Sequence, residues 1–130
     1  MVSKSMPSFP AEELKARSKR FAVRIVRLSQ ALPNPREAWV LGKQVLRSGT
    51  SVAANYRAAC RWRSKPDFIS KIGILVEEID ETISWLELLV ETGIVTKRRM
   101  TGLLTEACEL LASFAASQHT ARSHASSMDQ

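Results

Sequence analysis

The side chains of this chain with the clearest chemical capacity are arginines at helical spacing. Four of them step by three and four residues early in the sequence, at Arg17, Arg20, Arg24 and Arg27. On a helix that turns about 100° per residue, they fall in one arc of about 80°. Guanidinium groups form bidentate hydrogen bonds with phosphate oxygens, so this arc predicts contacts with a nucleic-acid backbone.

A second basic arc follows between positions 36 and 61. Its members are Arg36, Trp39, Lys43, Arg47, Arg57 and Arg61. The cations other than Arg57 fall within about 40° of one another on a helix, and Trp39 lies between Arg36 and Lys43. An aromatic side chain among cations suits base stacking beside phosphate contacts. Because few groups suit base edges, the predicted binding has little sequence preference. The alternatives are a solvated face, or a face that meets the acidic third helix of a neighbouring subunit.

Charge is divided unevenly along the 130 residues. Residues 1–63 hold 13 Lys and Arg against 3 acidic residues, a balance of +10, whereas residues 64–130 hold 6 against 10, a balance of −4. A basic half beside an acidic half indicates either a polyanionic partner or complementary self-association.

No motif typical of an enzyme is present. The sequence lacks a P-loop, a Gly-X-Gly-X-X-Gly run and a nucleophile elbow, so we predict no catalytic residue and no cofactor. A di-metal site in a helical bundle needs Glu-X-X-His motifs on inward faces. The two histidines, His119 and His124, instead lie in the C-terminal tail, where we expect them to be exposed. We therefore predict no metal site.

Two cysteines, Cys60 and Cys108, are too few for a secreted disulfide framework. We interpret both as buried thiols in a reducing cytoplasm, with a redox pair as the alternative. The N-terminus has no signal-peptide core, and no apolar run reaches the roughly 20 residues that span a bilayer. Ser48 and Asn55, polar residues on an apolar face, are expected to have structural roles.

Helical periodicity appears four times, which predicts a single all-α domain: an antiparallel up-down-up-down four-helix bundle with an ordered core of about 11–117. The first segment runs from about 11 to 32, before Pro33. The second starts with Asn34 as the N-cap, Pro35 as the first helical residue and Glu37 completing a capping box. Its weak helix stretch at 48–51 predicts either a kink or close packing.

The third segment starts at Ser64 and runs to Thr92, with Gly93 directly after its end. The fourth runs from about 96 or 101 to Ser117. We expect the residues before the first segment to be flexible and the Ser- and His-rich tail after Ser117 to fray.

The third segment carries more apolar residues than one inner face can hold. Those outside its main seam are Ile74, Trp85, Leu88 and Leu89. Exposed together they would form a patch typical of interaction sites, so the sequence predicts a homo-oligomer.

The run QVLRSGTSVAANYRAACRWR at 44–63, with SKPDFISKIGILVEEIDETISWLELL after it, resembles a bacterial four-helix-bundle family. That family includes proteins encoded in intervening sequences of large-subunit ribosomal RNA genes and is similar to the accessory protein of diversity-generating retroelements. The resemblance covers about 21–114, and its most specific element is Arg47, Ser51, Val52 and Asn55. It implies a homopentamer, no known enzymatic activity and, in the retroelement branch, binding to nucleic acid and a reverse transcriptase.

Taken together, the residues and the resemblance predict a cytoplasmic, non-enzymatic oligomeric bundle. Its Arg-rich surface is expected to bind RNA or DNA, as an accessory factor in an RNA-linked or reverse-transcriptase system. The rival hypothesis is a protein-binding adaptor or assembly module whose basic face meets an acidic protein.

Overall fold

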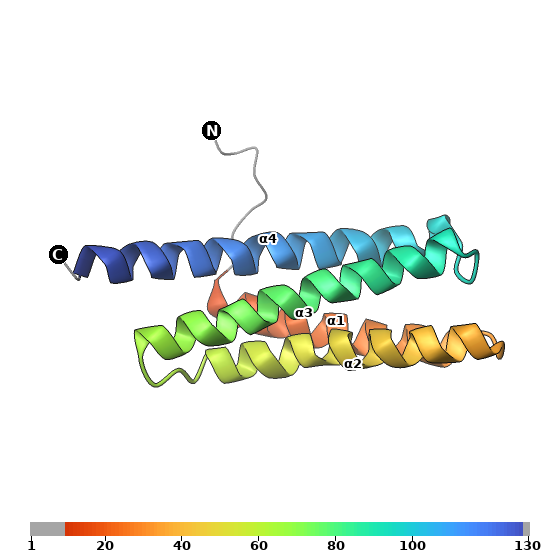
Figure 1. Cartoon of the computed structure of the whole chain (residues 1–130), viewed down its shortest axis with the longest axis horizontal. Helices are drawn as coiled ribbons and strands as arrows, with labels where there is room; N and C mark the ends of the chain where they lie inside the picture. The colour runs from red at the N-terminus through yellow and green to blue at the C-terminus, as the bar shows by residue number, and fades with distance from the viewer. Residues whose placement is uncertain (1–9, 129–130) are drawn as a thin grey trace.

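A computed structural model describes residues 10–128 and the side chains of residues 10–123. It contains four helices, α1 (Ala11–Ala31), α2 (Arg36–Ala59), α3 (Lys65–Glu91) and α4 (Lys97–Met128). Consecutive helices run in opposite directions, with turns at alternate ends (Figure 1). The predicted antiparallel four-helix bundle is confirmed. The predicted flexible N-terminal residues 1–9 lie outside the described part of the chain.

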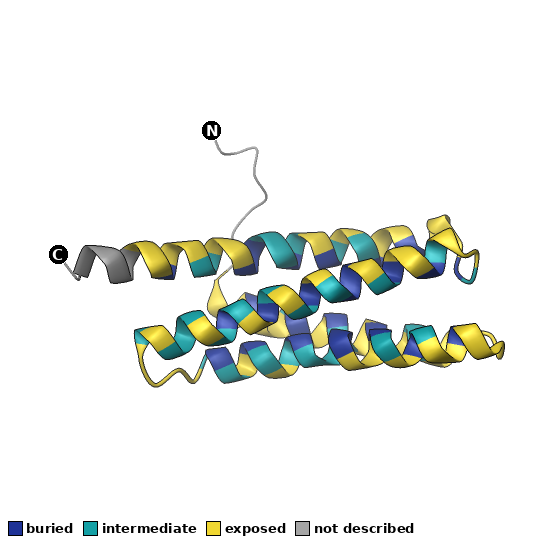
Figure 2. Cartoon of the chain, in the orientation of Figure 1, coloured by how far each residue is buried: buried dark blue, intermediate teal, exposed yellow. Residues whose placement is uncertain are grey.

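Each helix packs against the next in sequence, and α1 also lies beside α4, which closes the bundle. The buried side chains recur at helical spacing on every helix, as Figure 2 shows for the faces turned inward. The largest fully buried ones are Phe21 and Phe114, together with leucines and isoleucines of α1, α3 and α4. Burial of these apolar faces is the main stabilising contribution to such a bundle.

The ends of α3 follow from local hydrogen bonds, as predicted. The Ser64 hydroxyl accepts a hydrogen bond from the Asp67 backbone N–H at 3.2 Å. At the other end Gly93 adopts a φ of 79°, a conformation that glycine adopts without strain. The N–H groups of Ile94 and Val95 then donate to the Leu89 carbonyl at 3.0 and 3.1 Å. These bonds satisfy backbone groups that a helix terminus leaves unpaired.

The predicted start of the second helix is wrong by one residue. Pro35 has an extended ψ of 149° and occupies the N-cap position, so α2 begins at Arg36. The Trp39 N–H donates to the Pro35 carbonyl at 3.1 Å. Asn34 therefore lies outside the helix, and the predicted capping box with Glu37 does not form.

The predicted end of the fourth helix at Ser117 is also wrong, because α4 continues to Met128. Alanine is the best helix former, and Ala121 extends the apolar stripe of α4 with only 5% of its surface exposed. The side-chain amide of Gln118 lies close to Gly73 of α3. Gln118 and Ala121 thus pack against the bundle, which the weak apolar pattern of the tail does not predict.

The weak helix stretch of α2 allows close packing, one of its two predicted outcomes. A Cβ added at Gly49 would lie 2.8 Å from two carbons of the Ile25 side chain. The neighbouring Ser48 is fully buried, and its hydroxyl accepts a hydrogen bond from Thr82 of α3 at 2.9 Å. The absence of a side chain at Gly49 lets α1 approach α2, while Ser48 ties α2 to α3.

Candidate nucleic-acid interface

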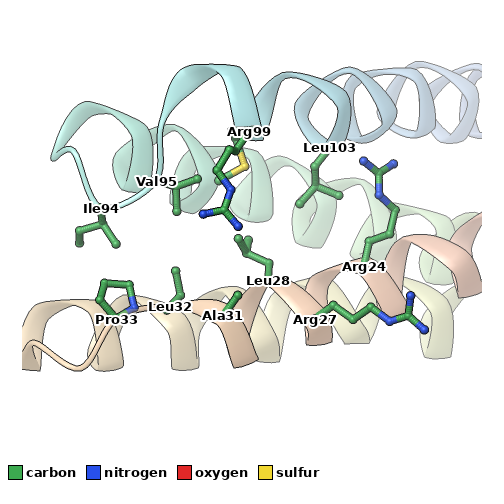
Figure 3. Close-up of a pocket in the computed structure, with 11 residues that line it drawn as sticks. Arg24, Arg27, Leu28, Ala31, Leu32, Pro33, Ile94, Val95, Arg99 and Leu103 are labelled. Atoms are coloured by element: carbon green, nitrogen blue, oxygen red, sulfur yellow. The ribbon is translucent and has the colours of Figure 1, made fainter.

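The most concentrated set of guanidinium groups lies where the end of α1 meets the start of α4. Arg24 and Arg27 of α1 and Arg99 of α4 line a cleft of about 330 Å³. Figure 3 shows Arg24 pointing toward α4, Arg27 lying along α1, and Arg99 reaching into the space between the two helices. Aliphatic side chains of both helices and of the α3–α4 turn form the walls, which comprise Leu28, Ala31, Leu32, Ile94, Val95 and Leu103.

The guanidinium groups of this cleft are not paired with an acidic side chain in the described part of the chain. Among the side chains at 10–123, no carboxylate lies within 4.0 Å of those of Arg24, Arg27 or Arg99. All three residues are exposed. Lys97 and Arg98 are also exposed and occupy the first turn of α4, where the helix dipole adds partial positive charge. The cleft is therefore an electropositive surface open to an anion.

Arg20 lies farther along α1 and shares a second hollow between α1 and α4 with Arg24, which Glu13 and Glu106 also line. The basic surface stops at Arg17, whose guanidinium binds Glu106 at 2.6 Å and Glu109 at 2.7 Å. The hydrogen bonds that the Arg17 guanidinium donates to Glu106 raise its pKa further above the ordinary value. Arg17, predicted to bind phosphate, is thus engaged within the subunit. We call Arg20, Arg24, Arg27 and Arg99 the arginine groove.

The second predicted basic arc does not join this groove. Arg47 points to the α2–α3 side of the bundle, where it bonds to Glu78 at 3.5 Å and to Glu81. The indole N–H of Trp85 donates to the same Glu81 carboxylate at 3.0 Å. The helix α1 packs against both α2 and α4, and α2 also packs against α3. The side of α1 that meets α4 and the side of α2 that meets α3 are therefore different faces of the molecule.

The remaining members of that arc fall into three groups. Trp39 is 63% exposed, and the Lys43 ammonium lies 4.8 Å from its ring centroid, in a cation–π contact. Both line a hollow with Arg36 at the α1–α2 end of the bundle. Arg57 lines a groove between α1 and α2, and Arg61 is exposed at the α2–α3 turn. Together with Arg47 on the α2–α3 side, the members of the predicted arc therefore occupy four places.

Only some of the apolar residues predicted at an oligomer interface are exposed. Ile74 and Leu88 are 46% and 37% exposed on the outer face of α3, and Trp85 is half-buried. Leu89 is fully buried in the core of its own subunit. Its carbonyl anchors the α3–α4 turn, which folds over the end of the helix. Leu89 is thus not part of the exposed face.

The predicted burial of both cysteines is wrong. Cys108 is exposed and Cys60 is half-buried, and both thiols are free. Cys108 follows Ala107, which faces the core, so it is turned outward by one helical step. His119 is exposed as predicted, whereas the His124 side chain lies outside the described side chains. Asn55 donates to the Ser51 carbonyl at 2.8 Å, a structural hydrogen bond.

The described residues contain no candidate metal site and no candidate membrane-spanning helix. Within them, no three or more His, Cys, Asp and Glu side chains come together as a metal ion would need. Of the helices in this part of the chain, none combines the length and apolar character needed to traverse a bilayer.

Arg99 was missed by the sequence-based prediction. It belongs to the run Lys97-Arg98-Arg99, which lies in the acidic half of the chain, outside the two predicted basic arcs. A run of three cations at a helix start is a usable signal, but only the pairing of α1 with α4 shows that Arg99 meets Arg24 and Arg27.

Comparisons with known proteins place these features in context. A family model described as 23S rRNA-intervening sequence protein matches residues 12–116. A crystal structure of a protein with unknown function from the S23 ribosomal protein family, from Bacteroides thetaiotaomicron VPI-5482, is 38% identical to this chain. The match covers 84% of this chain and 97% of that chain, with a TM-score of 0.79. No curated protein matches.

Proposed function

This chain belongs to the 23S rRNA-intervening sequence protein family, and on that premise we propose that it is a non-enzymatic, oligomeric nucleic-acid-binding protein. The proposed contact surface is the arginine groove between α1 and α4. The biological setting that the family suggests is an RNA-linked or reverse-transcriptase system in which the protein is an accessory factor. A reverse transcriptase is the protein partner proposed on that ground.

The observation that carries the proposal is a row of guanidinium groups without acidic partners among the described side chains. Arg20, Arg24 and Arg27 span eight residues of α1, and the seven steps from the first to the last cover about 10 Å along the helix axis. One strand of a duplex presents a phosphate about every 3.4 Å along its axis, so this row matches about three phosphates. Arg99 adds a fourth guanidinium from the facing helix. Contacts of this kind position a nucleic acid with little sequence preference.

For assembly, we propose that the outer face of α3 packs into the α1–α2 groove of a second copy. The α3 face combines two exposed apolar side chains with exposed carboxylates, and comprises Ile74, Glu77, Asp80, Ser84, Glu87 and Leu88. The α1–α2 groove, about 510 Å³, is lined by four small residues, Ala16, Thr50, Ala53 and Ala54, and by three cations and one carboxylate, Lys15, Lys19, Arg57 and Glu12.

Opposite charge and the four small residues of the α1–α2 groove favour this pairing over contacts between two identical faces. Because one surface meets a different surface, the contact is heterologous, and such contacts close into rings when the rotation permits. A ring of five is the number that the family resemblance implies. The arginine groove lies on the α1–α4 side and stays open in this arrangement.

The deciding experiment for nucleic-acid binding is a salt titration on two matched triple variants. The first replaces Arg20, Arg24 and Arg27 with Ala. The second replaces Arg61, Arg63 and Lys65, which removes the same charge at the opposite end of the bundle (Figure 1). Affinity for duplex DNA and structured RNA is measured by fluorescence anisotropy, with circular dichroism as the control for folding.

We expect the groove variant alone to lose most of the affinity. Its slope of log K against log salt should fall by about 0.9 for each phosphate contact removed on B-DNA. Equal loss in both variants would mean that net charge alone drives binding. If the parent fails to bind at about 50 mM salt, where such contacts are strong, the adaptor hypothesis replaces this one.

A further inference from the structure

We propose that the cleft between the end of α1 and the start of α4 holds one unpaired nucleotide of a bound strand. The base would lie among the aliphatic walls, and its phosphate on the guanidinium groups of Arg24 and Arg27. This inference rests on the proposed function and specifies which part of a nucleic acid the groove selects.

The cleft is large enough for one base. Its volume is about 330 Å³. Since a water molecule occupies about 30 Å³ in the liquid, this is room for about eleven water molecules, which a single nucleobase can displace. A solvated phosphate alone would leave the apolar part of the cleft unused.

The chemistry of the walls points to a flat, largely apolar ligand. Leu28 and Ala31 approach from α1, and Val95 and Leu103 from the opposite side, as Figure 3 shows. Arg99 reaches into the space between them, where a guanidinium plane can stack on the face of a base. Phosphate-binding surfaces that only follow a backbone do not need such walls.

The arrangement selects against a base that is already paired. In a duplex the faces of the bases are covered by stacking, and its phosphates are presented on the outside. Only a base at a strand end, in a bulge or in a loop can enter the cleft without unstacking. A protein with this cleft should therefore prefer nucleic acid with an unpaired nucleotide over the same blunt duplex.

The test compares three RNA hairpins on the full chain. One has a blunt stem, one has a single-nucleotide 3′ overhang, and one has an abasic residue at that overhang. We expect the overhang to bind about tenfold more tightly than the blunt stem, which is the scale of a single stacked base, and the abasic hairpin to lose the gain. Equal affinity for all three would overturn the inference while leaving the proposed function in place.

A cleft-filling variant locates the effect. Ala31 is an exposed residue of the cleft, and Ala31→Leu adds volume there without changing charge. Ala115→Leu makes the same change at an exposed position of α4 outside the cleft. We expect Ala31→Leu to abolish the preference for the overhang and Ala115→Leu to keep it. A preference that survives in Ala31→Leu would refute the cleft as its origin.

Adenosine monophosphate separates a strand ligand from a free nucleotide. If it competes only at millimolar concentration and removes only the gain due to the overhang, the cleft binds a nucleotide within a strand. Tight binding of free adenosine monophosphate together with no preference for the overhang would overturn that assignment. Failure of every hairpin to bind would reject the proposed function and this inference together.

Discussion

Arg17 of α1 and Glu106 of α4 form a bidentate ion pair, with 2.6 Å between Nη2 and Oε1 and 3.0 Å between Nε and Oε2. The same guanidinium also reaches Glu109 at 2.7 Å. The Arg17 and Glu106 side chains are only 11% and 20% exposed. This interaction joins the first and last helices, and it marks the point where the arginine groove ends.

Removal of this ion pair should destabilise the fold. Arg17→Ala leaves two carboxylates without their cation, and we expect it to lower the free energy of unfolding by about 2 kcal/mol. Urea denaturation measures the change. Arg20→Ala, which removes an exposed arginine one turn away, should stay within about 0.5 kcal/mol of the parent. In a double-mutant cycle with Glu106→Gln, additive effects would contradict a direct pairing.

Arg99 should contribute to nucleic-acid binding although it lies in the acidic half of the chain. If it neutralises one phosphate, Arg99→Ala should reduce the salt slope on B-DNA by about 0.9. Arg47→Ala removes the same charge on the α2–α3 side, where the guanidinium already contacts two glutamates, and should leave binding unchanged. The reverse pattern, measured by anisotropy, would move the contact surface to the α2–α3 side.

Charge exchange should test the proposed subunit contact. Glu77→Lys with Asp80→Lys should weaken self-association, because Lys and Arg side chains line the α1–α2 groove. Lys15→Glu with Lys19→Glu should do the same, and combining all four changes should restore the parent mass in light scattering. A monomeric mass for the parent, about 14.5 kDa, would reject the assembly proposal. Disruption that the combined variant fails to reverse would reject the pairing of these two faces.

Substitution at Gly49 should show how tightly α1 packs on α2. A new Cβ would lie 2.8 Å from two Ile25 carbons, so Gly49→Ala should destabilise by about 1–3 kcal/mol. Gly73→Ala is the matched control, because its nearest neighbour is the end of the Gln118 side chain at 3.2 Å, which can move. There the better helix propensity of alanine should leave stability unchanged or raised. Thermal unfolding of both variants provides the comparison, and equal stability would contradict the close contact.

The start of α3 should contribute a pH-dependent term to stability. The hydrogen bond from Lys71, followed by that from the Arg63 backbone N–H, lowers the pKa of Asp67 below its ordinary value of 3.8. A carboxyl group whose pKa is lowered by folding stabilises the protein above its unfolded pKa, and this contribution is lost as pH falls through the folded pKa. Asp67→Asn should therefore reduce stability at pH 7 and flatten its loss below pH 4. Unfolding curves of equal pH dependence in parent and variant would contradict this assignment.

The elements themselves were predictable because their causes are local. The apolar periodicity of the four segments, the Ser64–Asp67 cap and the Gly93 turn depend on residues three to six positions apart. The arc of Arg20, Arg24 and Arg27 has the same origin, since helical spacing alone places these side chains on one side of α1. The start of α2 was misplaced by one residue because Pro35 can serve as either N-cap or first helical residue.

Which charges meet, and which apolar residues stay exposed, was decided by the packing of helices. Arg17 is paired by glutamates 89 and 92 residues away, and Leu89 is fully buried in the core of the bundle. Arg99 joins the arginine groove only because α4 lies beside α1. The spacing of residues along one helix sets the angle between their side chains, but it contains no information about which neighbouring helix lies on that side. That relationship appears only when the apolar faces of all four helices are buried together.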